Sequence, residues 1–110
     1  DIKANGADET QYVSEQTELD ISVELDTGDY VSEYADWWFI IDTPFGWIYL
    51  DPHSSWSPGL DVTYQGGLIE ITETSILVIP GLPAGSYTFY FAVNLFDSGL
   101  FYDIIEVNVS

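Results

Sequence analysis

The hydrophobic residues of this chain recur at every second position, which is the period of a β-strand. Segment 17–26 shows the pattern with four aliphatic residues that alternate with charged or hydroxyl-bearing ones: Leu19, Ile21, Val23 and Leu25. Segment 85–94 repeats it with larger side chains: Tyr87, Phe89, Phe91 and Val93. Each segment therefore predicts a strand that buries one face and exposes the other.

Similar short segments predict the remaining strands, at 34–42, 46–51, 60–64, 68–72, 75–79 and 102–110. The last of these places four residues on one face: Asp103, Ile105, Val107 and Val109. Turns rich in Gly, Pro and Asp separate the segments, and no segment repeats with the period of a helix. Strands at such short intervals predict an all-β fold: an immunoglobulin-like β-sandwich of about 7–9 antiparallel strands, with residues 1–110 as a single domain.

Segment 35–51 departs from the alternation, because its residues are apolar on both sides. Trp37, Phe39 and Ile41 would share one face of a strand, whereas Trp38 and Ile40 would share the opposite face. A half-exposed strand does not need a second apolar face. Either a loop such as 51–59, which carries Trp56, covers the second face, or that face contacts a partner.

An open second face would form an interaction surface. If Trp37 points into the core, Trp38 and Ile40 lie outside, beside residues of the neighbouring strand. The predicted surface consists of Trp38, Ile40, Trp47, Tyr49 and Tyr90. Such a patch would reach several hundred Å², a size that usually marks a binding surface on a soluble monomer.

A second local signal supports the sandwich. The run Leu82-Pro83-Ala84-Gly85-Ser86-Tyr87 has the L-x-x-G-x-Y form of a tyrosine corner, in which a tyrosine hydroxyl bonds to the backbone a few residues upstream. The alternative is an ordinary glycine turn followed by a buried tyrosine. Both readings imply nearly the same fold.

Several segments together resemble a small immunoglobulin-like domain of secreted and surface-exposed proteins of environmental bacteria. They are DIKANG, ADWW, TPFGW, VTYQG and LPAGSYTFYFAV, and they span residue 1 to about residue 94. The resemblance implies a sandwich fold and no established activity. Its members carry a longer Asn-, Gly- and Asp-rich run after the YTFYF strand, suggestive of a calcium loop, whereas this chain has only residues 94–99 there.

The charge of the chain excludes some partners. Lys3 is the only Lys or Arg against 19 Asp and Glu, so the formal charge is −18. Nucleic acid is excluded, because phosphate binding depends on Lys and Arg. Such a charge repels itself and favours a setting rich in salt or divalent ions. No apolar run is long enough to insert in a membrane, and a chain that starts at Asp1 is typical of an exported product or an excised domain. We expect an extracellular or cell-surface protein.

Two groups of oxygen-bearing residues are candidate cation sites, with Ca²⁺ as the candidate cofactor. The first surrounds a turn at Gly6, and the second belongs to the last hairpin. The residues are Asp1, Asn5, Asp8 and Glu9 in the first group, and Asn94, Asp97 and Asp103 in the second. The alternative is that these carboxylates only attract diffuse counterions.

The sequence predicts no enzyme. His53 is the only histidine and lies in a polar turn, cysteine is absent, and carboxylate pairs are too common here to discriminate. The expected role is a structural or adhesive domain that self-associates into a homo-oligomer, filament or surface assembly, through the aromatic face or an edge strand. The alternative is a carbohydrate-binding module whose Trp and Tyr rings stack on a polysaccharide.

Overall fold

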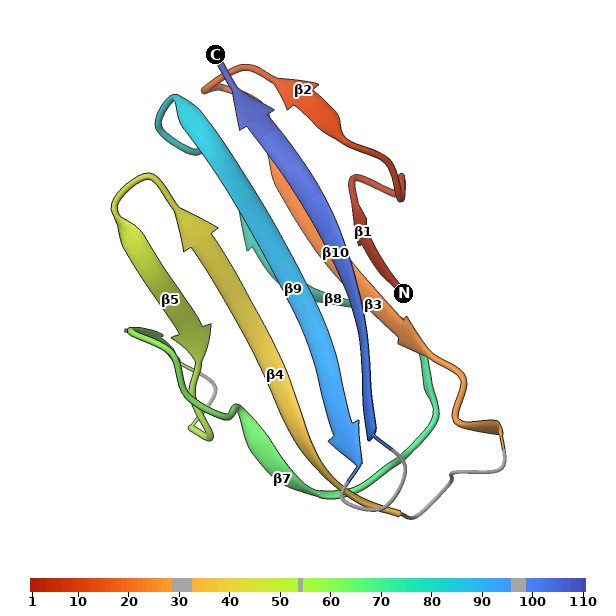
Figure 1. Ribbon diagram of the computed structural model, residues 1–110. Helices are drawn as coiled ribbons and strands as arrows, with labels where there is room; N and C mark the ends of the chain where they lie inside the picture. Colours follow the sequence, from red (N-terminus) through yellow and green to blue (C-terminus); the bar gives the residue numbers. More distant parts are fainter. Residues whose placement is uncertain (29–32, 54, 96–98) are drawn as a thin grey trace.

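A computed structural model describes residues 1–28, 33–53, 55–95 and 99–110 of the chain (Figure 1). The described residues form ten strands in two sheets, which confirms the predicted all-β sandwich. The strands are β1 (Ile2–Ala4), β2 (Gln11–Val13), β3 (Leu19–Leu25), β4 (Tyr34–Thr43), β5 (Gly46–Leu50), β6 (Trp56–Pro58), β7 (Tyr64–Gly67), β8 (Ile71–Ile79), β9 (Gly85–Leu95) and β10 (Gly99–Val109). The count exceeds the expected 7–9 because three strands of only three residues each were not foreseen: β1, β2 and β6.

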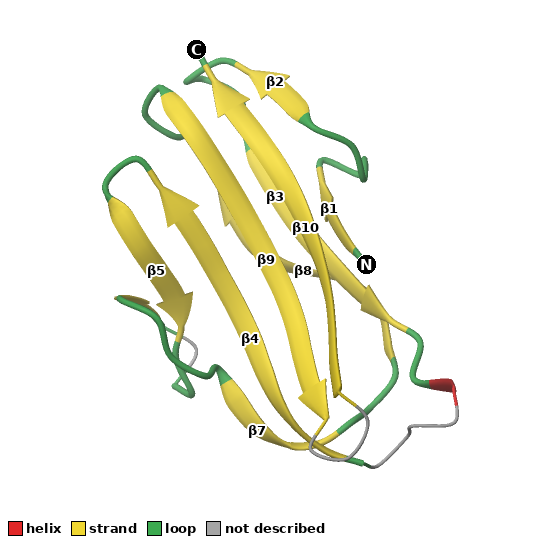
Figure 2. Cartoon of the chain, viewed as in Figure 1, coloured by secondary structure: helices red, strands yellow, loops and turns green. Residues whose placement is uncertain are grey.

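The smaller sheet has the order β1-β3-β8, and the larger sheet has the order β2-β10-β9-β4-β5-β6, with β7 also paired to β4. In Figure 1, β3 and β8 of the smaller sheet pass behind β9 and β10, and β1 is seen to the right of β10. Figure 2 shows the strands joined by loops. Neighbouring strands pair antiparallel except β2 and β10, which run parallel. The N-terminal segment therefore contributes β1 to the smaller sheet and β2 to the larger sheet.

The core lies between the two sheets and consists of the side chains that the alternation assigned to it. The smaller sheet contributes Ile2, Leu19, Ile21 and Val23. The larger sheet contributes aromatic residues, and Phe39 and Phe91 stack with ring centroids 4.8 Å apart. Trp37 lies next to Phe91, at 6.3 Å. The inward faces of β3, β9 and β10 were thus predicted correctly, because the apolar residues of each strand are buried mainly on one face.

The predicted arrangement of residues 60–72 is wrong. The glycines at 66 and 67, expected in a turn, belong to β7 and pair with Ala35 and Tyr34 of β4. The segments predicted as separate strands at 68–72 and 75–79 contribute to one continuous strand, β8. Two register shifts against β3 interrupt the alternation along β8, which made it resemble two short strands.

The predicted tyrosine corner is confirmed. The hydroxyl of Tyr87 donates a hydrogen bond of 2.7 Å to the carbonyl of Pro83. The adjacent Ala84 N–H donates to a carboxylate oxygen of Glu15, at 3.0 Å. Burial, with the nearby charge of Glu15, raises the pKa of the Tyr87 hydroxyl, so Tyr87 stays a neutral donor at physiological pH. The corner fixes the start of β9, one of the two central strands of the larger sheet.

Candidate functional site

Strand β4 has two apolar faces, and they meet different surroundings. Trp37 is only 4% exposed and points into the core, as does Ile41. Trp38 and Ile40 project from the outer face of the larger sheet, where they are half-buried. The structure therefore confirms that neighbouring tryptophans point to opposite sides of the strand.

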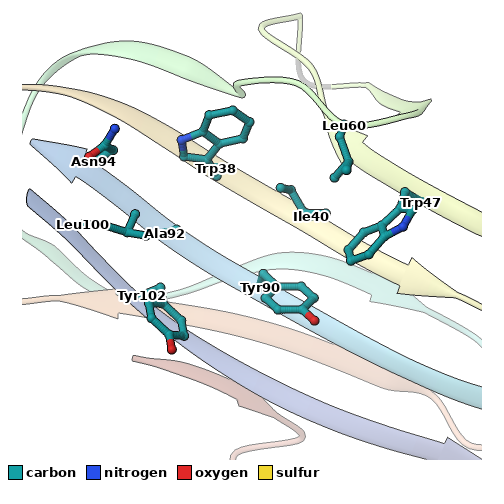
Figure 3. Close-up of a pocket in the computed structure, with 9 residues that line it drawn as sticks. All are labelled: Trp38, Ile40, Trp47, Leu60, Tyr90, Ala92, Asn94, Leu100 and Tyr102. Atoms are coloured by element: carbon teal, nitrogen blue, oxygen red, sulfur yellow. The ribbon is translucent and has the colours of Figure 1, made fainter.

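The outer face of the larger sheet contains an open apolar groove of about 520 Å³. Figure 3 shows its side chains, which come from β4, β5, β9, β10 and the loop after β6. We call it the aromatic groove. Its lining residues are Trp38, Ile40, Trp47, Leu60, Tyr90, Ala92, Asn94, Leu100 and Tyr102.

Strand register explains why this face is hollow. Trp38 pairs with Ala92, and Ala92 pairs with Tyr102, so the three form one row across β4, β9 and β10. Paired residues project to the same side of a sheet. The small side chain of Ala92 therefore lies between two large rings and forms the floor of the aromatic groove (Figure 3). The rings of Trp47 and Tyr90 lie 5.9 Å apart.

The aromatic groove is open to solvent. Tyr102 is 68% exposed, Leu100 58% and Trp47 40%. The described residues of the loop at 51–59 do not line the groove, and Trp56 is partly buried against the core instead. From the loop between β6 and β7, Leu60 alone lines the groove, and it is itself 55% exposed. Of the two alternatives raised by the sequence, the uncovered face is the one found.

Four of the five predicted surface residues line the aromatic groove, and one does not. Tyr49 pairs with Ile40 and so belongs to the same sheet face, but it lies outside the groove. Leu100 and Tyr102 were missed, although the alternation had already placed Asp103 and Ile105 on the opposite face of that strand. Leu60 was placed in a predicted strand at 60–64, but it lies in the loop between β6 and β7.

Charged residues are absent among the described residues that line the aromatic groove, and Asn94 provides its amide group. The only Lys or Arg of the sequence, Lys3, also lies away from the groove. Lys3 Nζ lies 3.6 Å from Glu73 and 3.9 Å from Asp1, on the outer face of the smaller sheet. The groove is therefore an uncharged area on a protein of charge −18.

The first candidate cation group is not assembled as predicted. The side chain of Asn5 ties its turn to β3: its oxygen accepts the Asp20 N–H at 2.8 Å, and its amide donates to the Glu18 carbonyl at 3.1 Å. The Asp1 carboxylate lies near Lys3, while Asp8 and Glu9 border a different hollow, beside β10.

The second candidate group is also not formed by its described members. Asn94 lines the outer aromatic groove, whereas Asp103 points inward and accepts the Ile2 N–H at 3.0 Å. Asp103 thus links β10 to β1 in the other sheet, and Asp97 lies outside the described residues. Within the described ranges, no three acidic or histidine side chains gather closely enough to hold a metal ion.

His53 lies exposed in the loop after β5, where Asp51 organises the backbone. The Asp51 carboxylate accepts the N–H groups of His53 and Ser55, at 2.9 and 3.0 Å, and the hydroxyl of Ser57 at 2.8 Å. The bonds from Ser55 and Ser57 are the main cause of a lowered pKa at Asp51. The Asp51 carboxylate therefore has a structural role, since its three hydrogen bonds hold the loop after β5 together.

Comparison with known proteins found no family model that matches the chain and no curated protein that matches its sequence. The described part of the chain has no helix of the length and apolar character needed to cross a bilayer.

Proposed function

We propose that this protein is a non-enzymatic structural or adhesive domain that works outside the cell and self-associates through the aromatic groove. The observation that carries the proposal is the open, uncharged row of Trp38, Ala92 and Tyr102 on the outer face of the larger sheet. An outer sheet face in water normally carries polar residues. Large exposed apolar patches on soluble proteins mark contact surfaces.

The charge distribution supports a contact between copies at this place. Two molecules of charge −18 repel one another over most of their surface. A contact that buries carboxylates against carboxylates would also cost their desolvation. The aromatic groove avoids both costs, because its described lining has no charged group. The same charge supports a salty extracellular setting, where counterions screen the remaining repulsion.

Edge strands are a weaker route to assembly. β8 is an edge of the smaller sheet and is nine residues long, so it could in principle add a strand from a neighbour. Two register shifts interrupt its pairing with β3, and irregularities of this kind protect edges from further pairing. The proposal therefore places the contact on the sheet face.

The immunoglobulin-like character of the fold is part of this proposal. Three features support it: the tyrosine corner at Tyr87, the buried Trp37 on a central strand, and an N-terminal segment divided between the two sheets. Domains of this architecture are common at cell surfaces. That association supports the proposed setting without naming a partner.

Analytical ultracentrifugation tests the proposed association. Wild-type protein should sediment faster as its concentration rises, and Trp38→Asp should abolish the increase by placing a charge in the aromatic groove. Tyr12→Asp is the matched control, because Tyr12 is 80% exposed on β2 and is not part of the groove lining. A wild-type protein that remains monomeric up to millimolar concentration would contradict the proposal.

A carbohydrate-binding module is the second candidate function. The observation that favours it is the combination of exposed Trp47 and Tyr102 rings with the amide of Asn94 in one hollow. Aromatic rings can stack on sugar rings, and an amide can fix a hydroxyl. A polysaccharide that shifts the tryptophan fluorescence of a monomer, with the shift lost in Trp38→Asp, would favour this function over self-association.

A further inference from the structure

The turn between β4 and β5 carries an exposed apolar side chain on a well-fixed support. Phe45 is 75% exposed at this turn, which we call the hairpin tip (residues 43–46). The Thr43 hydroxyl accepts the Phe45 N–H at 3.0 Å and donates to the Gly46 carbonyl at 2.6 Å. Gly46 has φ 119°, a conformation that glycine adopts readily. These bonds hold the turn in one shape.

The base of the hairpin tip is also packed against its own molecule. Pro44 lies so close to Gly85 at the start of β9 that a Cβ atom at Gly85 would collide with it. Pro44, with a fixed backbone angle, and the Thr43 bonds leave Phe45 little freedom other than that of its own ring. Binding through Phe45 would therefore lose little conformational entropy.

We propose that Phe45 of one molecule inserts into the aromatic groove of another copy of this chain. This inference rests on the proposed self-association and names the segment that fills the groove. A dry cavity of about 150 Å³ is enough to bind benzene. The groove, at about 520 Å³, therefore has room for the ring of Phe45 and part of its turn.

Shape favours this contact over a face-to-face pairing of two grooves. Two copies related by a two-fold axis through Ala92 would place one hollow against another. The space between them would lose the dispersion contacts that a close-packed interface gains. A projecting side chain supplies the missing volume, and Phe45 is a large, wholly apolar one.

Charge favours it as well. The hairpin tip consists of Thr, Pro, Phe and Gly, and the described lining of the groove is also uncharged. The contact therefore joins two surfaces that bring no carboxylates of their own against each other. Tyr12 is at least as exposed as Phe45, at 80%, but it carries a hydroxyl that burial would have to satisfy.

The contact joins two different patches of the same chain, so it is heterologous. Each molecule offers one hairpin tip and one groove, and repetition of such a contact produces open chains unless the rotation closes a ring. One side chain in one groove buries much less than the roughly 800 Å² per partner of a standard interface. We therefore expect association that is weak per contact and grows with concentration.

The test compares full-length variants by sedimentation velocity over a concentration series. Phe45→Asp removes the projecting ring, and Ala92→Leu fills the floor of the groove without adding charge. Each should raise the dissociation constant at least about tenfold, which corresponds to about 1.4 kcal/mol. Phe45→Ala should act like Phe45→Asp, while Tyr12→Asp should associate like wild type. Thermal melts monitor the folding of each variant.

Mixing the variants provides the decisive measurement. Phe45→Asp keeps an intact groove, and Ala92→Leu keeps an intact hairpin tip. An equimolar mixture should therefore form one-to-one complexes with the dissociation constant of a single wild-type contact, within about threefold, and nothing larger. If Ala92→Leu destabilises the fold, Tyr102→Asp replaces it as the groove variant, since Tyr102 is largely exposed.

Three results would overturn this inference in distinguishable ways. If Phe45→Asp associates like wild type while Trp38→Asp does not, the groove binds another part of the chain and the proposed function stands. If Ala92→Leu associates more strongly, the contact is a flat face, and again only the inference fails. A mixture that stays monomeric excludes the contact, whereas a monomeric wild type overturns the proposed function as well.

Discussion

The two outward faces of the sandwich differ sharply, although both belong to the same acidic chain. On the smaller sheet, Lys3, Ser22 and Glu73 form a polar cluster across all three strands, with Ser22 Oγ 3.5 Å from a Glu73 oxygen. On the larger sheet, the comparable row across three strands consists of Trp38, Ala92 and Tyr102. One face follows the usual rule for a sheet in water, and the other breaks it.

The difference identifies the aromatic face as a feature beyond the needs of folding. A sandwich of this size folds with polar residues on an outer face, as its own smaller sheet demonstrates. Apolar residues exposed in this way add nothing to the core and increase the tendency to aggregate. Their concentration around one groove of the larger sheet agrees with the proposed contact on that side.

The largest expected effect separates the two faces of β4. Trp37→Ala should lower the free energy of unfolding by about 3–5 kcal/mol, because it leaves a cavity beside Phe91. Trp38→Ala should lower it by only about 1 kcal/mol, because that ring remains partly in water. Urea unfolding followed by circular dichroism measures both. Similar losses in the two variants would mean that the outer face is part of the folding core.

A smaller effect is expected from removing single tyrosine hydroxyls of β9. Tyr87→Phe should cost about 1 kcal/mol, because the bond to the Pro83 carbonyl is lost in a partly buried corner. Tyr90→Phe is the matched control on the aromatic face and should change stability by less than about 0.5 kcal/mol. The same unfolding measurement applies. Equal losses would contradict the assignment of the hydroxyl bond as the stabilising feature.

The smallest effect is expected on the polar face. Lys3→Gln removes ion pairs whose carboxylate partners Asp1 and Glu73 are 39% and 49% exposed, and such pairs contribute less than about 1 kcal/mol. The melting temperature should fall slightly at low salt and not at all in about 1 M salt, where screening is nearly complete. A large loss at high salt would show that Lys3 acts through packing instead.

Much of the fold could be predicted from alternation alone. In β3 one face is aliphatic and the other is polar, and in β9 and the second half of β10 apolar residues occupy every position of one face but not of the other. Both the strand and its orientation therefore follow from the residues. The opposite orientations of Trp37 and Trp38 follow from the same period. Strands of three residues such as β2 are too short to show an alternation. The two glycines of β7 have the composition of a turn, so the strand was not predicted there.

The candidate site was predicted in part, for a similar reason. Trp38, Ile40, Trp47 and Tyr90 lie on strands with a clear period, so their common face could be inferred. The sequence could not show whether the members of each cation group lie together, because nearness along a chain does not indicate which face of a strand a carboxylate occupies. Asp103 illustrates this, since its carboxylate points inward and accepts the N–H of Ile2 in the opposite sheet.

The sequence by itself determined the class of fold, the two-sided character of β4, the tyrosine corner and the acidic, cation-poor surface. Local periodicity and composition are enough for these, because each depends on neighbouring residues. Tertiary structure alone decided that Ala92 lies between Trp38 and Tyr102, that Trp56 turns toward the core, and that the outer face is hollow and uncovered. Strand order and register create those relations, and they depend on residues far apart in the chain.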